Sequence, residues 1–326
     1  MRMLMEAPDI DWPLALRVST VGTSDLPQIG QPELRRLVAD LRGTARRAGR
    51  LVAAHLGIDS VGAADVRVVD WAGWGRAVST MVGAVTSRLN LEPAPDGPIR
   101  RIRATGNGLL VGVGLRVAAR RLLGQYDAYT GSDTLYLVAP SILAQERHHG
   151  FVADDFRLWV ALHEQTHALQ FRAAPWLDGW LSRRVELILN DEGSSVQGFA
   201  GWARTGDISS LFASGQAGDA LAELTAAMTF LEGHADHTAD TVGRPHIPSV
   251  DLLRRAFTRA PGPSGLGRLS RAFDKDAQYR DGLTFCRKVS SYRGRRALSA
   301  AFAEPTNLPT PTEIADPRAW VERVHG

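Results

Sequence analysis

Two histidines and a glutamate form a compact chemical motif in the middle of the chain. They occupy the segment His163-Glu164-Gln165-Thr166-His167, which is the HExxH pattern of zinc enzymes. Four residues turn an α-helix by about 400°, so the two imidazoles lie on one face, about 6 Å apart along the helix axis. Both can bind one zinc ion, and Glu164 lies close enough to accept a proton from a zinc-bound water. The motif therefore predicts His163 and His167 as metal ligands and Glu164 as the catalytic carboxylate.

A zinc ion held by two histidines needs a third protein ligand and an open position for water. Residues 221–240 form a second helical pattern, in which Glu232 and Asp236 lie four residues apart on one face. We expect Glu232 to bind the metal and Asp236 to hold a ligating histidine by its second ring nitrogen. The Glu-Asp spacing is weak evidence by itself. Other residues remain alternatives for the third ligand: His234, His237, Glu192 and Asp219.

Hydrolysis of an amide also needs a donor for the oxyanion that develops on the attacked carbonyl. The sequence offers three candidates for stabilising this transition state: Tyr279, His234 and His237. Each is equally well explained as a core tyrosine or a surface histidine without a catalytic part. Residues 134–138 form the clearest strand in the sequence.

The elements that position these residues follow from hydrophobic spacing. Residues 156–171 keep a helical pattern around the HExxH motif, which a break at Pro175 ends. The remaining pattern predicts helices over 32–57 and 71–89, a short strand at 66–69 and a largely helical chain after residue 154. The expected fold class is α+β, predominantly α-helical, with a small sheet beside the HExxH helix.

A glycine-rich stretch at residues 105–114 superficially imitates a dinucleotide-binding turn. Such a turn must follow an apolar parallel strand, whereas here the preceding residues 99–103 are rich in arginine. We therefore expect close helix packing at Gly108 and Gly112, and no site for an organic cofactor.

Composition limits the remaining function classes. The chain has 326 residues and a net charge of +3, which is too little to predict nucleic-acid binding. A single cysteine, Cys286, excludes a zinc site built from thiolates. The first residues lack the pattern of a signal peptide and no apolar run is long enough to span a bilayer, so we expect a cytoplasmic protein without a membrane partner. The sequence does not determine the oligomeric state.

The chain resembles the bacterial zincin-like metallopeptidase type 2 family, a group labelled as associated with biosynthesis of a deazaflavin coenzyme. The likeness runs along most of the chain, through residues 10–12, 68–74, 123–127, 137–140, 157–160, 171–176, 231–236, 278–279 and 308–310. The resemblance implies a gluzincin-like site in which His163, His167 and Glu232 bind one zinc ion per chain and Glu164 is catalytic. In zincins an edge strand above the HExxH helix commonly pairs with an extended peptide, so the resemblance implies this role for residues 134–138. It does not identify the substrate.

Breaks rich in proline and glycine at residues 92–98 and 259–267 suggest three parts. We expect a mainly helical N-terminal segment over 1–97, a zincin-like catalytic core over 98–258 and a C-terminal helical segment over 259–326 that packs on the core.

The leading hypothesis is a zinc-dependent metallohydrolase, a peptidase in which Glu164 assists the attack of zinc-bound water on a peptide or other amide. Two alternatives remain open: an inactive, zinc-stabilised scaffold or binding protein, and a hydrolase of a non-peptide amide.

Overall fold

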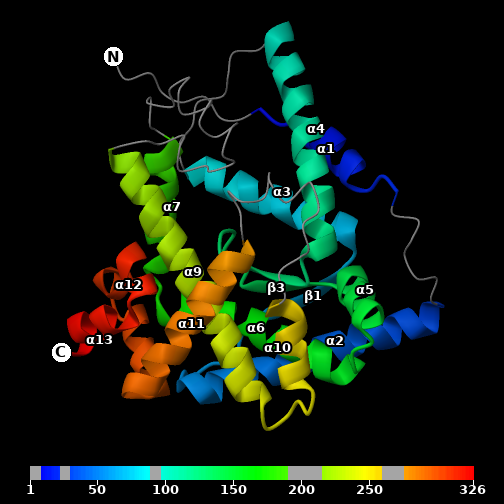
Figure 1. Ribbon diagram of the computed structural model, residues 1–326. Helices are drawn as coiled ribbons and strands as arrows, with labels where there is room; N and C mark the ends of the chain where they lie inside the picture. The colour runs from blue at the N-terminus through cyan, green and yellow to red at the C-terminus, as the bar shows by residue number, and fades with distance from the viewer. Residues whose placement is uncertain (1–8, 23–29, 89–96, 190–214, 259–274) are drawn as a thin grey trace. The chain divides into compact units, whose positions relative to one another are not determined.

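The computed structural model describes residues 9–22, 30–88, 97–189, 215–258 and 275–326 (Figure 1). Contacts divide the chain into two compact units, the first comprising residues 1–51 and 60–168, the second residues 52–59 and 169–326. The division falls inside two continuous helices, which therefore contribute to both units. The three-part division expected from the sequence stays a prediction.

The first unit combines helices with a small sheet. Its elements are α1 (Trp12–Ser19), most of α2 (Gln31–Leu56), β1 (Asp65–Val69), α3 (Trp71–Arg88), α4 (Pro98–Arg121), β2 (Gly124–Asp127), β3 (Thr134–Val138), α5 (Ala139–His149) and most of α6 (Ala153–Ala173). The helices expected at 32–57 and 71–89 and the strands at 66–69 and 134–138 are confirmed. The fold is α+β and mostly helical, as the sequence indicates.

The sheet has three strands in the order β1-β3-β2. β1 runs parallel to β3, and β2 runs antiparallel to it, with Gly124 opposite Leu137 and Asp127 opposite Thr134. The expectation that residues 134–138 form an edge strand is therefore wrong, because β3 is paired on both sides. All five β3 residues are buried, which suits a central strand.

α4 packs against α1 through two glycines. A Cβ at Gly108 would lie 2.8 Å from the carbonyl oxygen of Asp11, and one at Gly112 would lie 2.7 Å from that of Ala15. A larger residue would therefore force the helices apart. The expectation of close helix packing at these glycines is confirmed.

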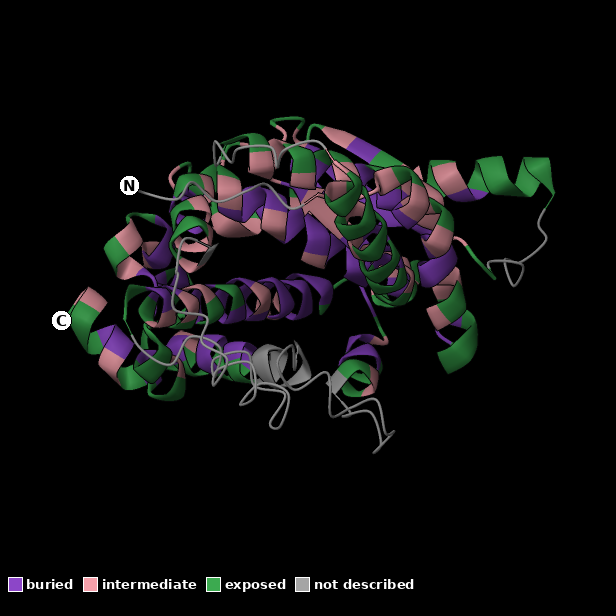
Figure 2. Ribbon diagram, turned by 90° about the horizontal axis from the view of Figure 1, so that it is seen from above, coloured by how far each residue is buried: buried purple, intermediate pink, exposed green. Residues whose placement is uncertain are grey.

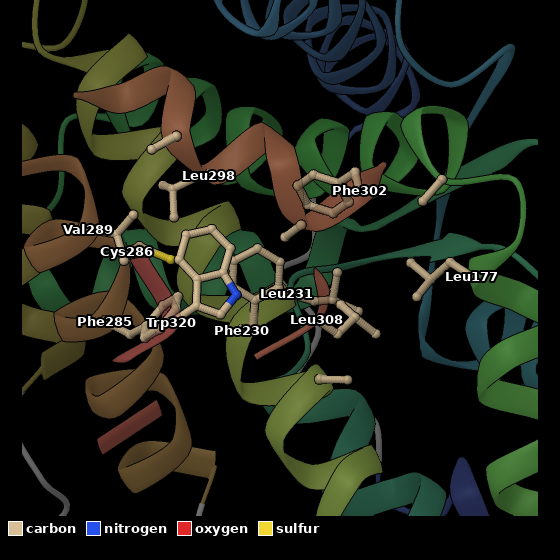
Figure 3. Packing of buried hydrophobic residues seen from close by; sticks show 14 of the residues in the cluster. Leu177, Phe230, Leu231, Phe285, Cys286, Val289, Leu298, Phe302, Leu308 and Trp320 are labelled. Carbon is tan, nitrogen blue, oxygen red and sulfur yellow. The ribbon is translucent and has the colours of Figure 1, made fainter. Parts of the chain in front are cut away.

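The second unit is helical in the part that the structure describes. It holds α7 (Leu177–Leu189), α9 (Gln216–Gly243), α10 (Val250–Thr258), α11 (Lys275–Arg293), the 3₁₀-helices η4 (Arg295–Phe302) and η5 (Pro305–Asn307), α12 (Pro311–Ala315) and α13 (Pro317–His325). Figure 3 shows the core that these helices enclose, with Phe230, Phe285 and Trp320 packed near Leu298 and Phe302. Edge-to-face contacts join Phe285 to Phe230 and to Trp320.

Burial follows the amphipathic patterns. Figure 2 shows buried and exposed residues alternating along single helices, as expected when one face packs inward. None of the helices in the described ranges is long and apolar enough to cross a membrane.

Candidate metal centre

The HExxH motif lies on α6, as its periodicity predicts. Asp154 and Asp155 lie in the first turn of α6, so neither is its N-cap residue. Their negative charges are favourable there because they lie at the positive end of the helix dipole. His163 and His167 are half-buried, whereas Glu164 is buried. The helix thus holds both imidazoles and the carboxylate within one turn.

The two imidazoles point their Nε2 atoms toward each other. These atoms are 3.2 Å apart, and the rings lie nearly perpendicular at 80°. Two nitrogen ligands of a tetrahedral zinc ion, each about 2.0–2.1 Å from it, are separated by about 3.3 Å. The observed separation therefore fits a shared metal ion.

Glu232 of α9 completes a possible ligand set. Within the described residues, His163, His167 and Glu232 each offer a ligand atom, and these atoms lie within 4.8 Å of one another. Two histidines and a glutamate are a known donor set of catalytic zinc sites. The residues present therefore fit a zinc ion.

Glu164 lies against the first residue of β2. A Cβ at Gly124 would be 2.7 Å from Glu164 Cγ and 2.8 Å from its Cδ. Only glycine leaves the carboxylate its present position. The first residue of β2 therefore lies directly against the Glu164 side chain.

Gln165, inside the motif, fixes α6 to neighbouring backbone. Its Oε1 accepts a hydrogen bond from the Ala63 N–H at 2.8 Å, and its Nε2 donates to the Ala45 carbonyl at 3.1 Å. The side chain is fully buried, and these two hydrogen bonds give both its carbonyl oxygen and its amide nitrogen a protein partner. This pair of bonds restrains the rotation of the helix that carries the histidines.

Gln170 makes the corresponding link to α9. It lies one turn after His167, and its Nε2 donates to the Leu231 carbonyl at 2.8 Å and lies 3.1 Å from His234 Nδ1. His234 is buried against the rings of Phe230 and Phe302, which also contact each other, and it does not belong to the ligand group. Gln170 thus contacts both the peptide that precedes Glu232 and the imidazole that follows it.

Asp236 is held by a buried arginine of α10. Arg254 Nη1 donates to Asp236 Oδ2 at 2.6 Å, and its Nε donates to Asp240 at 2.9 Å. Arg287 also donates to Asp240. Burial lowers the pKa of Arg254, but the charges of Asp236 and Asp240 outweigh this effect and the pKa is raised overall. Asp236 is therefore part of a buried network of compensated charges on α9.

His237 lies outside the ligand group as well. Its Nε2 is 3.0 Å from Ser290 Oγ on α11. Burial, together with the charge of Arg287, lowers the pKa of His237 to about 4, so the imidazole is neutral at pH 7.

The remaining candidates from the sequence are less informative. Asp219 is exposed in the first turn of α9, about 20 Å along the helix axis from Glu232, so it is not a third ligand. Tyr279 lies on α11, but its side chain is outside the described part. Glu192 lies outside the described residues altogether.

Sequence reasoning missed three residues that shape the site: Gly124, Gln170 and Arg254. Gln170 carried a signal, because it follows His163 by seven residues and therefore lies on the same helix face. Gly124 and Arg254 gave no such signal in the sequence, because their roles depend on contacts between segments distant in sequence.

Comparisons with known proteins identify a similar fold and a family. A search of curated proteins finds no match. The fold is similar to the crystal structure of a protein from Chloroflexus aurantiacus, described as a candidate hydrolase with a novel fold, with 24% identity, a TM-score of 0.68 and coverage of 96% of this chain and 98% of that one. A family model named zincin-like metallopeptidase matches residues 10–321. The chain therefore belongs to the zincin-like metallopeptidase family.

Proposed function

We propose that the protein is a zinc-dependent peptidase in which His163, His167 and Glu232 hold the metal and Glu164 is the general base. The observation that carries this proposal is the convergence of two imidazoles and one carboxylate beside a second, buried carboxylate. The family assignment supports the same chemistry.

A zinc ion bound there would lower the pKa of a water molecule and polarise the carbonyl of the amide. Glu164 takes the proton as the water oxygen forms its bond to the carbonyl carbon. It then delivers the proton to the amide nitrogen as the C–N bond breaks, which yields a carboxylic acid and an amine. Gly124 supports this role, because it leaves room for the carboxylate against β2.

Asp236 is proposed to hold the second ring nitrogen of a ligating histidine, which would fix its tautomer. Its contact with Arg254 favours the ionised carboxylate that this role needs. Tyr279 and His237 remain candidates for the donor to the oxyanion.

The edge of β2 is the proposed substrate strand. β2 is one of the two outer strands of the sheet in the described residues, and it is the one that begins beside Glu164. An extended peptide that pairs with β2 would place one of its amides near the catalytic carboxylate.

A scaffold role is less well supported. Structural zinc sites are usually closed by four protein ligands. In the described ranges the ligand group has three members, which leaves a position for water or substrate.

The test is Glu164→Gln, assayed with a mixed peptide library and mass spectrometry of the products. We expect this variant to keep its zinc and lose at least about 10²-fold in hydrolysis. Glu186→Gln, at an exposed site on α7, is the matched control and should remain active. Equal turnover by wild type and Glu164→Gln would refute the mechanism, and a zinc-loaded wild type that cleaves only non-peptide amides would refute the substrate class.

A further inference from the structure

α4 is a helix with an unusual charge distribution. Its 24 residues include arginine at positions 100, 101, 103, 116, 120 and 121, and neither aspartate nor glutamate. The helix therefore carries a strong positive charge in a chain whose net charge is only +3.

The same helix exposes a continuous apolar stripe. The side chains are Ile99, Ile102, Leu109, Leu110, Val113 and Val117, and they are between 46% and 74% exposed. Their spacing of mostly three and four residues places them within about 100° of the helix circumference and along about 27 Å of its axis. We call these six residues the α4 stripe.

The α4 stripe does not face the interior of the first unit. The opposite side of α4 packs on α1 through Gly108 and Gly112, and its buried residues Leu115 and Ala119 belong to a core cluster with Trp74 and Val138. α4 thus has two apolar faces, of which one is buried and one is exposed.

Arginines border the α4 stripe on both sides. Arg103 and Arg121 are exposed and lie five turns apart on one flank. Arg116 and Arg120 lie toward the other flank, where Arg120 Nη2 donates to the Gly22 carbonyl.

We propose that the α4 stripe docks on a membrane surface rich in anionic phospholipids, with α4 lying in the plane of the interface. Interfacial helices combine an apolar face with flanking cations, which bind lipid phosphates while their aliphatic stems cover apolar surface. A second copy of the chain fits less well, because contact between two α4 helices would bring arginines against arginines. The sequence excluded a membrane partner only for lack of a spanning segment, which peripheral docking does not require.

Co-sedimentation of the full chain with vesicles tests the proposal. The vesicles are pure phosphatidylcholine or a 7:3 mixture of phosphatidylcholine and phosphatidylglycerol. We expect binding to the mixed vesicles only, with a strong decrease when salt rises from 0.1 M to 1 M. Ile102→Ser with Leu110→Ser should weaken binding about tenfold or more. Arg103→Gln with Arg121→Gln should weaken it by about fivefold for each arginine removed.

Matched controls change exposed residues of the first unit away from α4. Val61→Ser with Val152→Ser removes similar apolar groups, and Arg46→Gln with Arg47→Gln removes the same charge. Both controls should bind within twofold of wild type. Sedimentation equilibrium without vesicles measures self-association. The wild type should show no dimer that is lost in Leu110→Ser, so the two proteins should give the same molecular mass.

Three results would overturn the proposal. The first is no binding to anionic vesicles at 0.1 M salt, which would leave the α4 stripe to a protein partner. The second is equal binding by wild type and the Ile102, Leu110 variant. The third is a dimer that dissociates on Leu110→Ser, which would show that a second copy covers the stripe.

Discussion

Gln170 is predicted to couple the stability of the protein to its zinc affinity. Its amide donates to the Leu231 carbonyl and contacts His234 Nδ1, so it fixes α6 to the residue that precedes Glu232. Gln170→Met keeps the side-chain volume and removes both interactions, which separates hydrogen bonding from packing.

The expected magnitude follows from the two acceptors. The Leu231 carbonyl also lies within the hydrogen-bond ladder of α9, so losing the Gln170 donor costs about 1 kcal/mol there. The buried His234 nitrogen loses a donor at about 1–3 kcal/mol. Together the free energy of unfolding should fall by about 2–4 kcal/mol. Zinc affinity should fall about 10–100-fold, the usual effect of losing an interaction that orients a metal site.

Urea unfolding with a chelator present measures the first quantity, and competitive zinc titration measures the second. Gln145→Met, on α5, is the matched control and should change stability by less than about 0.5 kcal/mol. A Gln170→Met protein with wild-type stability and wild-type zinc affinity would refute this account of how α6 and α9 are held together.

Three further predictions test single features. Gly124→Ala should displace the Glu164 carboxylate by about 1 Å from its present contact and lower peptide hydrolysis about 10²-fold at unchanged zinc content; full activity would contradict this. Burial lowers the pKa of His237 to about 4 in the folded protein, so the unfolded chain binds more protons between pH 4 and 6.5. The free energy of unfolding should therefore fall by at most about 3 kcal/mol on acidification through this range. His237→Asn should flatten this pH profile in urea unfolding. Arg254→Met leaves Asp236 without its cation and should cost about 3–5 kcal/mol in the same assay, whereas a cost below 1 kcal/mol would show that the network is not structural.

Local pattern was sufficient to predict the part of the site that lies on one helix. The periodicity around His163 and His167 placed both imidazoles on one face of α6, and the two Nε2 atoms do converge. Likewise, Gly108 and Gly112 were correctly assigned to helix packing, because their context excluded a dinucleotide turn.

Strand order and contacts between segments distant in sequence could not be predicted from local pattern. An isolated apolar run such as residues 134–138 does not reveal whether one or both of its sides are paired, so β3 was wrongly placed at the edge. His234 was a candidate ligand by residue type, but its burial against Phe302 depends on a segment distant in sequence. Such contacts are decided by tertiary packing.

The central claim is that His163, His167 and Glu232 hold one zinc ion and that Glu164 does not. Elemental analysis after dialysis, on wild type beside His163→Ala, Glu232→Ala and Glu164→Gln, tests it directly. We expect one zinc per chain in wild type and Glu164→Gln, and loss of zinc in the other two variants. Stoichiometric zinc retained in Glu232→Ala, or none bound by wild type in excess metal, would contradict it.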